Sequence, residues 1–298
     1  MNVLITGSGG FIGRNLVHKF LRIGSSVTAL YRSTMPRQHG REARLALVQH
    51  DLSKPLPENT QALDGIDVLI HAASHTHITP NSTMEKYLRS NIEGMKNIID
   101  FAIKKEVKKF IYLSTVSVYG EISNPILTEE TPLNRPNLYG ASKYLGYLML
   151  EDVARELSSV TMLLPGVVGK NYFTPWLGKI TKKALAGEEI TYFNGDSLFN
   201  NVVDVKEIYR FIQHWLTLSV EGVGKVNLAA SEPMQVRQVV ELIIERTKSV
   251  SCVTEETSQN SSFVIATKVL EEQFQYKPRK TIEIIDAYLS NNLTYESN

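Results

Sequence analysis

Tyr139 and Lys143 have the residue types and the spacing of a proton-transfer pair. They lie four residues apart in a helical pattern over about 137–157, so both side chains share one helix face. A free phenol with a pKa of about 10 is a poor base at neutral pH, but a neighbouring ammonium favours the phenolate. Tyr139 would then protonate a carbonyl oxygen as a hydride arrives, or deprotonate an alcohol as a hydride leaves.

A hydroxyl that could orient the same oxygen is expected from Thr115, which closes an apolar run that begins at Phe110. The spacing Tyr-x-x-x-Lys is not specific by itself, and a second one occurs at 276–280. That second pair contains Pro278, which disfavours a helix interior and removes the shared face. We therefore assign the chemistry to the first pair, together with Thr115 and a glycine-rich turn near the N-terminus.

The glycine-rich turn follows an apolar run at residues 3–5 and opens a helical pattern. Gly7, Gly10 and Gly13 have the spacing G-x-x-G-x-x-G, which permits a tight turn and lets a pyrophosphate approach the backbone. The free N–H groups at the start of the helix favour an anion there. We therefore predict dinucleotide binding by Gly7, Gly9, Gly10, Phe11, Ile12 and Gly13.

The end of the second apolar run, at residues 27–31, indicates which dinucleotide is bound. An NAD site usually has an acidic residue there, and an NADP site uses a nearby arginine for the 2′-phosphate. This chain has Arg32 and no acid at that point, so we predict NADP as the preferred cofactor, with NAD as the alternative. Arg14 and Arg37 are candidates to assist.

Two later run ends are expected to wall the same cofactor. A carboxylate after the run at 45–48 could accept a hydrogen bond from the adenine amino group, and small residues after the run at 68–70 would let a ribose approach the backbone. The residues predicted to line the cofactor at these two points are Asp51, Leu52, His71, Ala72 and Ala73.

Short apolar runs alternate with helical patterns through the first half of the chain, and this predicts an α/β fold with a parallel sheet covered on both faces. The long helix after the fourth run is expected to open with a capping box from Ser82 to Glu85. We predict a Rossmann-like, doubly wound parallel sheet with a smaller C-terminal α/β substrate lobe. Residues 1–165 would form the dinucleotide-binding domain, with some later segments returning to it, and 166–298 mainly the substrate-binding lobe.

The composition excludes several other classes of protein. The formal net charge of the 298 residues is +1, so neither nucleic acid nor an anionic membrane is an expected partner. No apolar run approaches the roughly 20 residues that span a bilayer, and the start lacks a basic leader. The single cysteine, Cys252, cannot form an internal disulfide, and we expect a cytoplasmic protein. His75 and His77, without a third ligand, do not predict a metal site.

Together, the glycine turn, Thr115, Tyr139 and Lys143 resemble the extended short-chain dehydrogenase/reductase family of nucleotide-sugar epimerases, dehydratases and ketoreductases, over nearly the whole chain. The resemblance implies that Thr115, Tyr139 and Lys143 are catalytic and that Lys143 also holds the nicotinamide ribose. It also places Pro165 at the cofactor and a homodimer in solution. Residues expected near the substrate are His75, Thr115, Tyr172, Phe173 and Trp176.

Two departures from the family pattern narrow the function. Dehydratases of the family carry an Asp-Glu pair directly after the catalytic threonine, and this chain has Val116 and Ser117 there, so dehydration is disfavoured. The segment from Pro165 to Lys170 lacks the asparagine and tyrosine that many members have, and an arginine common just before Phe199 is also missing. The contacts that usually hold a nucleotide diphosphate in this family are therefore not all expected here, although Lys170 could replace one of them.

Three functions remain open on these residues. The first is an NADPH-preferring ketoreductase that acts on a 4-keto hexose, expected to be nucleotide-linked, with Tyr139 as general acid. The second is a nucleotide-sugar 4-epimerase that uses the same residues and regenerates its NAD. The third, of another class, is a catalytically silent dinucleotide sensor, which the intact catalytic set argues against.

Overall fold

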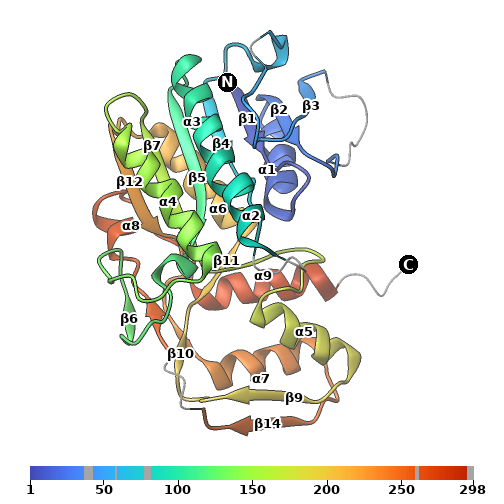
Figure 1. The fold of residues 1–298 in the computed structure, drawn as a ribbon. Helices are drawn as coiled ribbons and strands as arrows, with labels where there is room; N and C mark the ends of the chain where they lie inside the picture. The colour runs from blue at the N-terminus through green and yellow to red at the C-terminus, as the bar shows by residue number, and fades with distance from the viewer. Residues whose placement is uncertain (37–42, 58, 77–81, 259–261, 294–298) are drawn as a thin grey trace. The chain divides into compact units, whose positions relative to one another are not determined.

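The computed structural model describes residues 1–36, 43–57, 59–76, 82–258 and 262–293. Arg37 and His77 lie outside the described residues. The chain divides into two compact units (Figure 1). Unit 1 comprises Met1–Gly120, Leu133–Leu163 and Ile212–Val226, and unit 2 comprises Glu121–Pro132, Leu164–Phe211 and Asn227–Asn298.

Unit 1 is built on a seven-stranded sheet in its described residues, with the strand order β12-β7-β5-β4-β1-β2-β3. Strands β1 to β5 pair in parallel, with Val3 opposite both Val27 and Val68. This is the α/β, Rossmann-like architecture that the alternating runs predict. The strand bounds are β1 (Asn2–Thr6), β2 (Ser26–Tyr31), β3 (Leu45–Gln49), β4 (Val68–His71), β5 (Lys109–Thr115), β7 (Ser159–Leu164) and β12 (Val223–Asn227).

Helices cover both faces of this sheet, because its strands are apolar on both sides. Leu4, Leu69 and Phe110 pack with α3 (Gly94–Lys104) and α4 (Leu138–Asp152), which lie in front of the sheet in Figure 1. Helix α1 (Phe11–Arg22) packs against β1 and β2. Helix α6 (Val205–Thr217) begins in unit 2 and ends in unit 1, where its Trp215 ring lies 4.6 Å below the ammonium of Lys109 on β5.

The segment before α3 differs from the single regular helix that the sequence predicts. Helix α2 (Met84–Tyr87) is followed by a π-helical turn (Leu88–Glu93) before α3 begins. The predicted capping box is wrong, because the N-cap is Thr83, whose hydroxyl accepts from the N–H of Lys86 at 3.4 Å. The Ser82 hydroxyl is bonded instead to His75 Nε2 at 3.0 Å, a partner that local spacing does not reveal.

Unit 2 contains small sheets and three helices that share a core. The pairs β8–β11, β9–β14 and β6–β15 are parallel, and β10–β13 is antiparallel. Residues from α5, α7 and α9, such as Ile180, Ile243 and Ile285, form the core. The strand bounds are β6 (Ile126–Leu127), β8 (Gly166–Val168), β9 (Ile190–Phe193), β10 (Leu198–Phe199), β11 (Val202–Asp204), β13 (Met234–Gln235), β14 (Val253–Glu256) and β15 (Val264–Ile265). The helix bounds are α5 (Trp176–Ala186), α7 (Val236–Thr247), α8 (Lys268–Glu272) and α9 (Thr281–Leu293).

Among the described residues, the structure shows neither a membrane-spanning helix nor a cluster of metal-binding side chains. No helix among them has both the length and the apolar content needed to cross a bilayer. No group of three or more His, Cys, Asp or Glu side chains in the same part of the chain is arranged to hold a metal ion.

Candidate active site

The glycine turn joins β1 to α1. At two of its glycines the neighbouring backbone lies too close to admit a side chain. Gly7 has φ +65°, and a Cβ there would lie 2.6 Å from the Ala73 nitrogen at the end of β4. A Cβ on Gly13 would lie 2.2 Å from the Gly7 oxygen, so α1 also lies directly against the turn. The Gly10 N–H closes the turn on the Gly7 oxygen at 2.9 Å. The start of a helix is a favourable place for an anion, and here it adjoins the turn.

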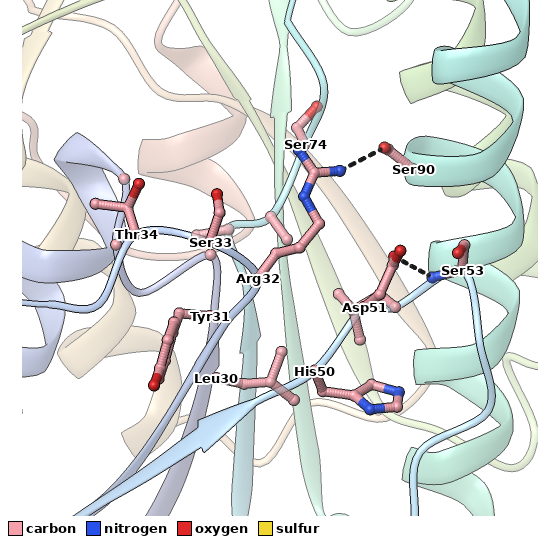
Figure 2. A pocket seen from close by; sticks show the side chains of 16 residues that line it. Leu30, Tyr31, Arg32, Ser33, Thr34, His50, Asp51, Ser53, Ser74 and Ser90 are labelled. Carbon is pink, nitrogen blue, oxygen red and sulfur yellow. Dashed lines mark hydrogen bonds between the residues drawn. The ribbon is translucent and has the colours of Figure 1, made fainter.

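A pocket opens beside this turn, at the carboxyl ends of β1 to β4 (Figure 2). It brings together eight of the predicted cofactor residues, which are Gly7, Gly9, Gly10, Arg32, Asp51, Leu52, Ala72 and Ala73. The predicted residues Phe11, Ile12, Gly13 and His71 adjoin it in sequence but do not line it. It also contains residues that spacing did not single out, which are Leu30, Tyr31, Ser33, Thr34, His50, Ser53, Ser74 and Ser90. Most of these residues are direct sequence neighbours of a predicted residue. Their position next to a strand end was therefore the sequence signal that could have identified them.

Arg32 and Asp51 are the charged residues of this pocket. Figure 2 shows the Arg32 side chain extending from the end of β2 toward Ser90, whose hydroxyl its Nη1 contacts at 3.4 Å. Burial tends to raise the pKa of Asp51, but the Ser53 N–H bond at 3.1 Å, together with Arg32 and Arg89, holds that pKa below its ordinary value. Asp51 is therefore an ionised acceptor at neutral pH, and Arg32 is exposed and able to meet an anionic group.

The end of β4 is tied to β1 by the Thr6 hydroxyl. Its Oγ1 accepts from the Ala73 N–H at 3.2 Å and is bonded to His71 Nδ1 at 2.9 Å. The His71 imidazole is 1% exposed and stacks on the Tyr112 ring at 5.7 Å. Burial, with a smaller contribution from Lys143, lowers the pKa of His71 to about 3. The ring is therefore a neutral group of the core.

Thr115 ends β5 and caps the short 3-10 helix η3 (Val116–Tyr119) that follows. Its Oγ1 accepts from the Ser117 N–H at 3.1 Å and donates to the Ser117 hydroxyl at 3.2 Å. The bond from the Ser117 N–H fixes the position of the Thr115 oxygen. The Thr115 hydroxyl proton, which the Ser117 hydroxyl now accepts, can rotate toward another acceptor without moving that oxygen.

Tyr139 and Lys143 lie in the first and second turns of α4, whose N-cap Asn137 accepts from the Gly140 N–H at 2.9 Å. A Cβ on Gly140 would lie only 2.1 Å from the Ser117 oxygen, so this first turn packs directly on η3. The structure thereby brings the turn that carries Tyr139 to the segment that carries Thr115.

Lys143 is 2% exposed, and its ammonium lies over the Tyr112 ring, 4.1 Å from the centroid. Burial lowers the pKa of Lys143 to about 7. A lysine with this pKa is partly protonated at neutral pH and can exchange its proton there, which ordinary lysines do not do. Tyr139 is only half-buried, and its ring lies 6.5 Å from that of Tyr87.

Asn91, in the π-helical turn, connects the end of β4 to α4. Its Oδ1 accepts from the His75 N–H at 2.7 Å, and its Nδ2 donates to the His75 oxygen at 3.0 Å and to the Ser142 hydroxyl at 2.8 Å. His75, expected near the substrate, is 8% exposed, and its ring packs edge-on against Tyr87 at 5.0 Å. The structure thus gives His75 bonding and packing partners within the protein.

The other residues expected near the cofactor or substrate belong to unit 2. Pro165 directly precedes β8, and Tyr172 forms an isolated bridge with Gly169. Phe173 packs edge-on against Tyr288 at 6.3 Å, and Trp176 packs on Phe199 at 5.1 Å. Both rings are partly buried and pack against the core of unit 2.

The second Tyr-x-x-x-Lys spacing also lies in unit 2 and does not form a helical pair. The segment from Tyr276 to Lys280 falls between α8 and α9. The Tyr276 hydroxyl is bonded to the buried Glu207 at 2.7 Å. The structure therefore agrees with its exclusion from the chemistry.

Comparison with known proteins identifies the family. The model of the NAD dependent epimerase/dehydratase family matches residues 3–229, and the chain belongs to this family. The dTDP-glucose 4,6-dehydratase of Mycolicibacterium smegmatis is 23% identical over 98% of this chain and 94% of its own length. A UDP-glucose 4-epimerase of Caenorhabditis elegans is 24% identical over 82% of each chain. The structure of MoeE5 in complex with UDP-glucuronic acid and NAD has the same fold, with a TM-score of 0.80 and 20% identity over 99% of this chain and 98% of that one. The protein is thus an enzyme of the NAD dependent epimerase/dehydratase family.

Proposed function

We propose that this protein inverts the configuration at C4 of a nucleotide-linked hexose and regenerates its NAD in each turnover. The observation that carries the proposal is the direct packing of the first α4 turn on η3, which gathers Thr115, Tyr139 and Lys143 in one region of unit 1. UDP-glucose 4-epimerases recur among the relatives, in Azospirillum brasilense as well as Caenorhabditis elegans, and this supports epimerisation over other reactions of the family.

The pocket and turn of unit 1 fit a dinucleotide. Gly7, Gly9 and Gly10 of the turn line the pocket, where a backbone without side chains lets phosphates approach closely, and the start of α1 favours their charge. No acidic residue lies in the first turn of α1 to oppose an anion. Asp51 and Arg32 would contact the adenosine half, and Ala72 and Ala73 let a ribose approach the end of β4.

Bound NAD would supply a hydride acceptor that returns the hydride after the sugar has presented its other face. Tyr139, as phenolate, would take the proton of the 4-hydroxyl and give it back to the 4-keto oxygen. Thr115, held by the Ser117 N–H, would donate its hydrogen bond to that same oxygen. The ammonium of Lys143 would favour the phenolate of Tyr139.

Dehydration is the less suited reaction of the family, because it requires an added acid and base at the site. Val116 and Ser117 follow Thr115, and neither side chain can serve as an acid at neutral pH. A 4,6-dehydratase activity is therefore not proposed, although dehydratases occur among the relatives.

The second candidate is an NADPH-dependent ketoreductase acting on a nucleotide-linked 4-keto sugar. The observation that favours it is Arg32, an exposed cation that lines the pocket at the end of β2, where the described residues 31–36 include no carboxylate to meet a ribose 2′-hydroxyl. In this reaction Tyr139 would donate one proton per turnover and recover it from solvent.

One experiment separates the two candidates. The dinucleotide that co-purifies is identified, and the protein is then incubated with UDP- and dTDP-linked hexoses and their 4-keto derivatives. An epimerase interconverts sugars with no net change in nicotinamide absorbance, whereas a reductase consumes NADPH in proportion to product. The Arg32→Asp variant should shift the NADPH:NADH preference of a reductase by roughly tenfold or more toward NADH. Tyr139→Phe should abolish either activity and leave dinucleotide binding intact. Sugar turnover by Tyr139→Phe at the wild-type rate would refute both candidates.

We also propose a cytoplasmic homodimer. The sole cysteine, Cys252, is exposed and free, which suits a reducing compartment. Leu138, Leu145 and Leu148 are exposed on α4 and would be covered by a second copy. Sedimentation of the wild type against Leu145→Glu tests the dimer, which the charged variant should dissociate.

A further inference from the structure

We propose that Tyr112, a buried residue of β5, is a positioning residue that holds the Lys143 ammonium beside Tyr139. The inference deepens the proposed function and rests on it for the role of Tyr139. It does not rest on which sugar is turned over or on the choice between epimerase and reductase.

Tyr112 contacts Lys143 at both ends. Its ring lies under the Nζ atom, 4.1 Å from centroid to nitrogen, and its hydroxyl donates to the Lys143 backbone oxygen at 3.3 Å. One side chain of β5 therefore fixes the start and the end of the Lys143 side chain. Because Tyr112 is 1% exposed, it has little freedom to leave this position.

The space for the Tyr112 ring is made by a glycine in α4. A Cβ on Gly146 would lie 2.4 Å from the Tyr112 hydroxyl oxygen and 2.8 Å from its ring carbon. The His71 ring stacks on Tyr112 at an interplanar angle of 24°, which holds the phenol from β4. Two neighbouring elements thus fit the ring into one position.

The Tyr112 ring is also the main electrostatic partner of the Lys143 ammonium. No carboxylate of the described residues forms an ion pair with Lys143, so no negative charge offsets the cost of burying its ammonium. Lys143 contacts the Tyr112 ring on β5 and acts on His71 on β4, and Tyr139 lies four residues before it on the same helix. Since His71 is neutral, the electron-rich face of Tyr112 is what favours the cation until Tyr139 ionises.

Four variants, three at Tyr112 and one control, test this role. Tyr112→Phe keeps the ring face and loses only the hydroxyl bond, while Tyr112→Met fills a similar volume without a ring. The matched control is Phe110→Met, which removes a buried ring from the same face of the same strand without contacting Lys143. Tyr112→Leu serves as a second ring-free variant in case the methionine variant does not fold.

The measurement is the titration of Lys143, followed by the chemical shift of its side-chain ε-carbon, and the pH profile of kcat. We expect loss of the ring to lower the midpoint of Lys143 by about one pH unit. The acid limb of kcat should move upward, since Tyr139 loses a cationic neighbour, and kcat at neutral pH should fall about tenfold. Tyr112→Phe and Phe110→Met should keep the wild-type midpoints.

The outcomes separate this inference from the proposed function. If Lys143 titrates alike in Tyr112→Met and Phe110→Met, Tyr112 does not hold the ammonium and the inference is wrong, whatever the activity. If Lys143 shifts as expected but no nucleotide sugar is turned over by the wild type, the structural role of Tyr112 stands and the proposed function fails. If Lys143 shifts and the pH profile of kcat does not, the link to Tyr139 is refuted.

Discussion

Gly140→Ala should separate Thr115 from Tyr139 and Lys143, the proposed catalytic groups, while leaving the helix that carries Tyr139 and Lys143 intact. The added Cβ would lie 2.1 Å from the Ser117 oxygen, where ordinary contacts begin at 3.4 Å, so α4 and η3 must move apart by about 1 Å. A displacement of about 1 Å between reacting groups can cost on the order of 100-fold in rate. We therefore expect kcat of the sugar reaction to fall about 100-fold.

The effect of Gly140→Ala on stability should be much smaller than its effect on rate. Alanine gains about 1 kcal/mol over glycine inside a helix, whereas overpacking costs about 1–3 kcal/mol. The expected net loss in the free energy of unfolding is therefore about 0–2 kcal/mol, measured by urea titration. The control is Ala141→Gly, which weakens the same turn by about 1 kcal/mol without a clash.

The assay for both variants is turnover of the identified nucleotide sugar, with dinucleotide binding followed by fluorescence. Ala141→Gly should retain most of its kcat although its loss of stability, about 1 kcal/mol, falls within the range expected for Gly140→Ala. If the two variants lose activity in proportion to stability, the packing of α4 on η3 does not position the site, and the reasoning is refuted.

Two further predictions concern the groups that support the site. Asn91→Ala should lower the free energy of unfolding by about 2–4 kcal/mol in urea titration, since it leaves the backbone groups of His75 and the Ser142 hydroxyl without their buried partner; a loss below about 1 kcal/mol would contradict this. His71 has a folded pKa of about 3 against an ordinary 6.5, so in that window the unfolded chain binds the extra proton and stability falls as pH falls. The loss should approach about 1.4 kcal/mol per pH unit, and His71→Phe should remove this slope; an unchanged slope would show that other groups cause it.

The sheet and the glycine turn could be predicted from the sequence, because both depend on local patterns. Apolar runs flanked by helical patterns define β1 to β5, and glycine spacing marks the turn wherever it occurs. The N-cap at Thr83 could not be chosen over Ser82 in this way, since the choice depends on His75, which becomes a partner of Ser82 only when the chain is folded.

The sequence predicted the residues of the candidate site, but it did not predict the residues that hold them in place. The types and spacing of Tyr139 and Lys143 indicate proton transfer, but no spacing connects Lys143 to Tyr112, which lies on another element 31 residues away. The same holds for Asn91 and Ser142, 51 residues apart. Such contacts arise when β5 and the π-helical turn pack against α4, so sequence spacing does not reveal them.

The structure also indicates which features of the site can change easily. Gly7, Gly13 and Gly140 each face backbone atoms at distances that exclude a Cβ, so any replacement must move a strand or helix. Arg32, by contrast, is an exposed side chain with one contact to Ser90 at 3.4 Å. Replacing it alters the charge offered to the adenosine half and moves no element. Cofactor preference should therefore respond to single substitutions at Arg32, whereas the geometry around Tyr139 should tolerate few, because backbone contacts set it.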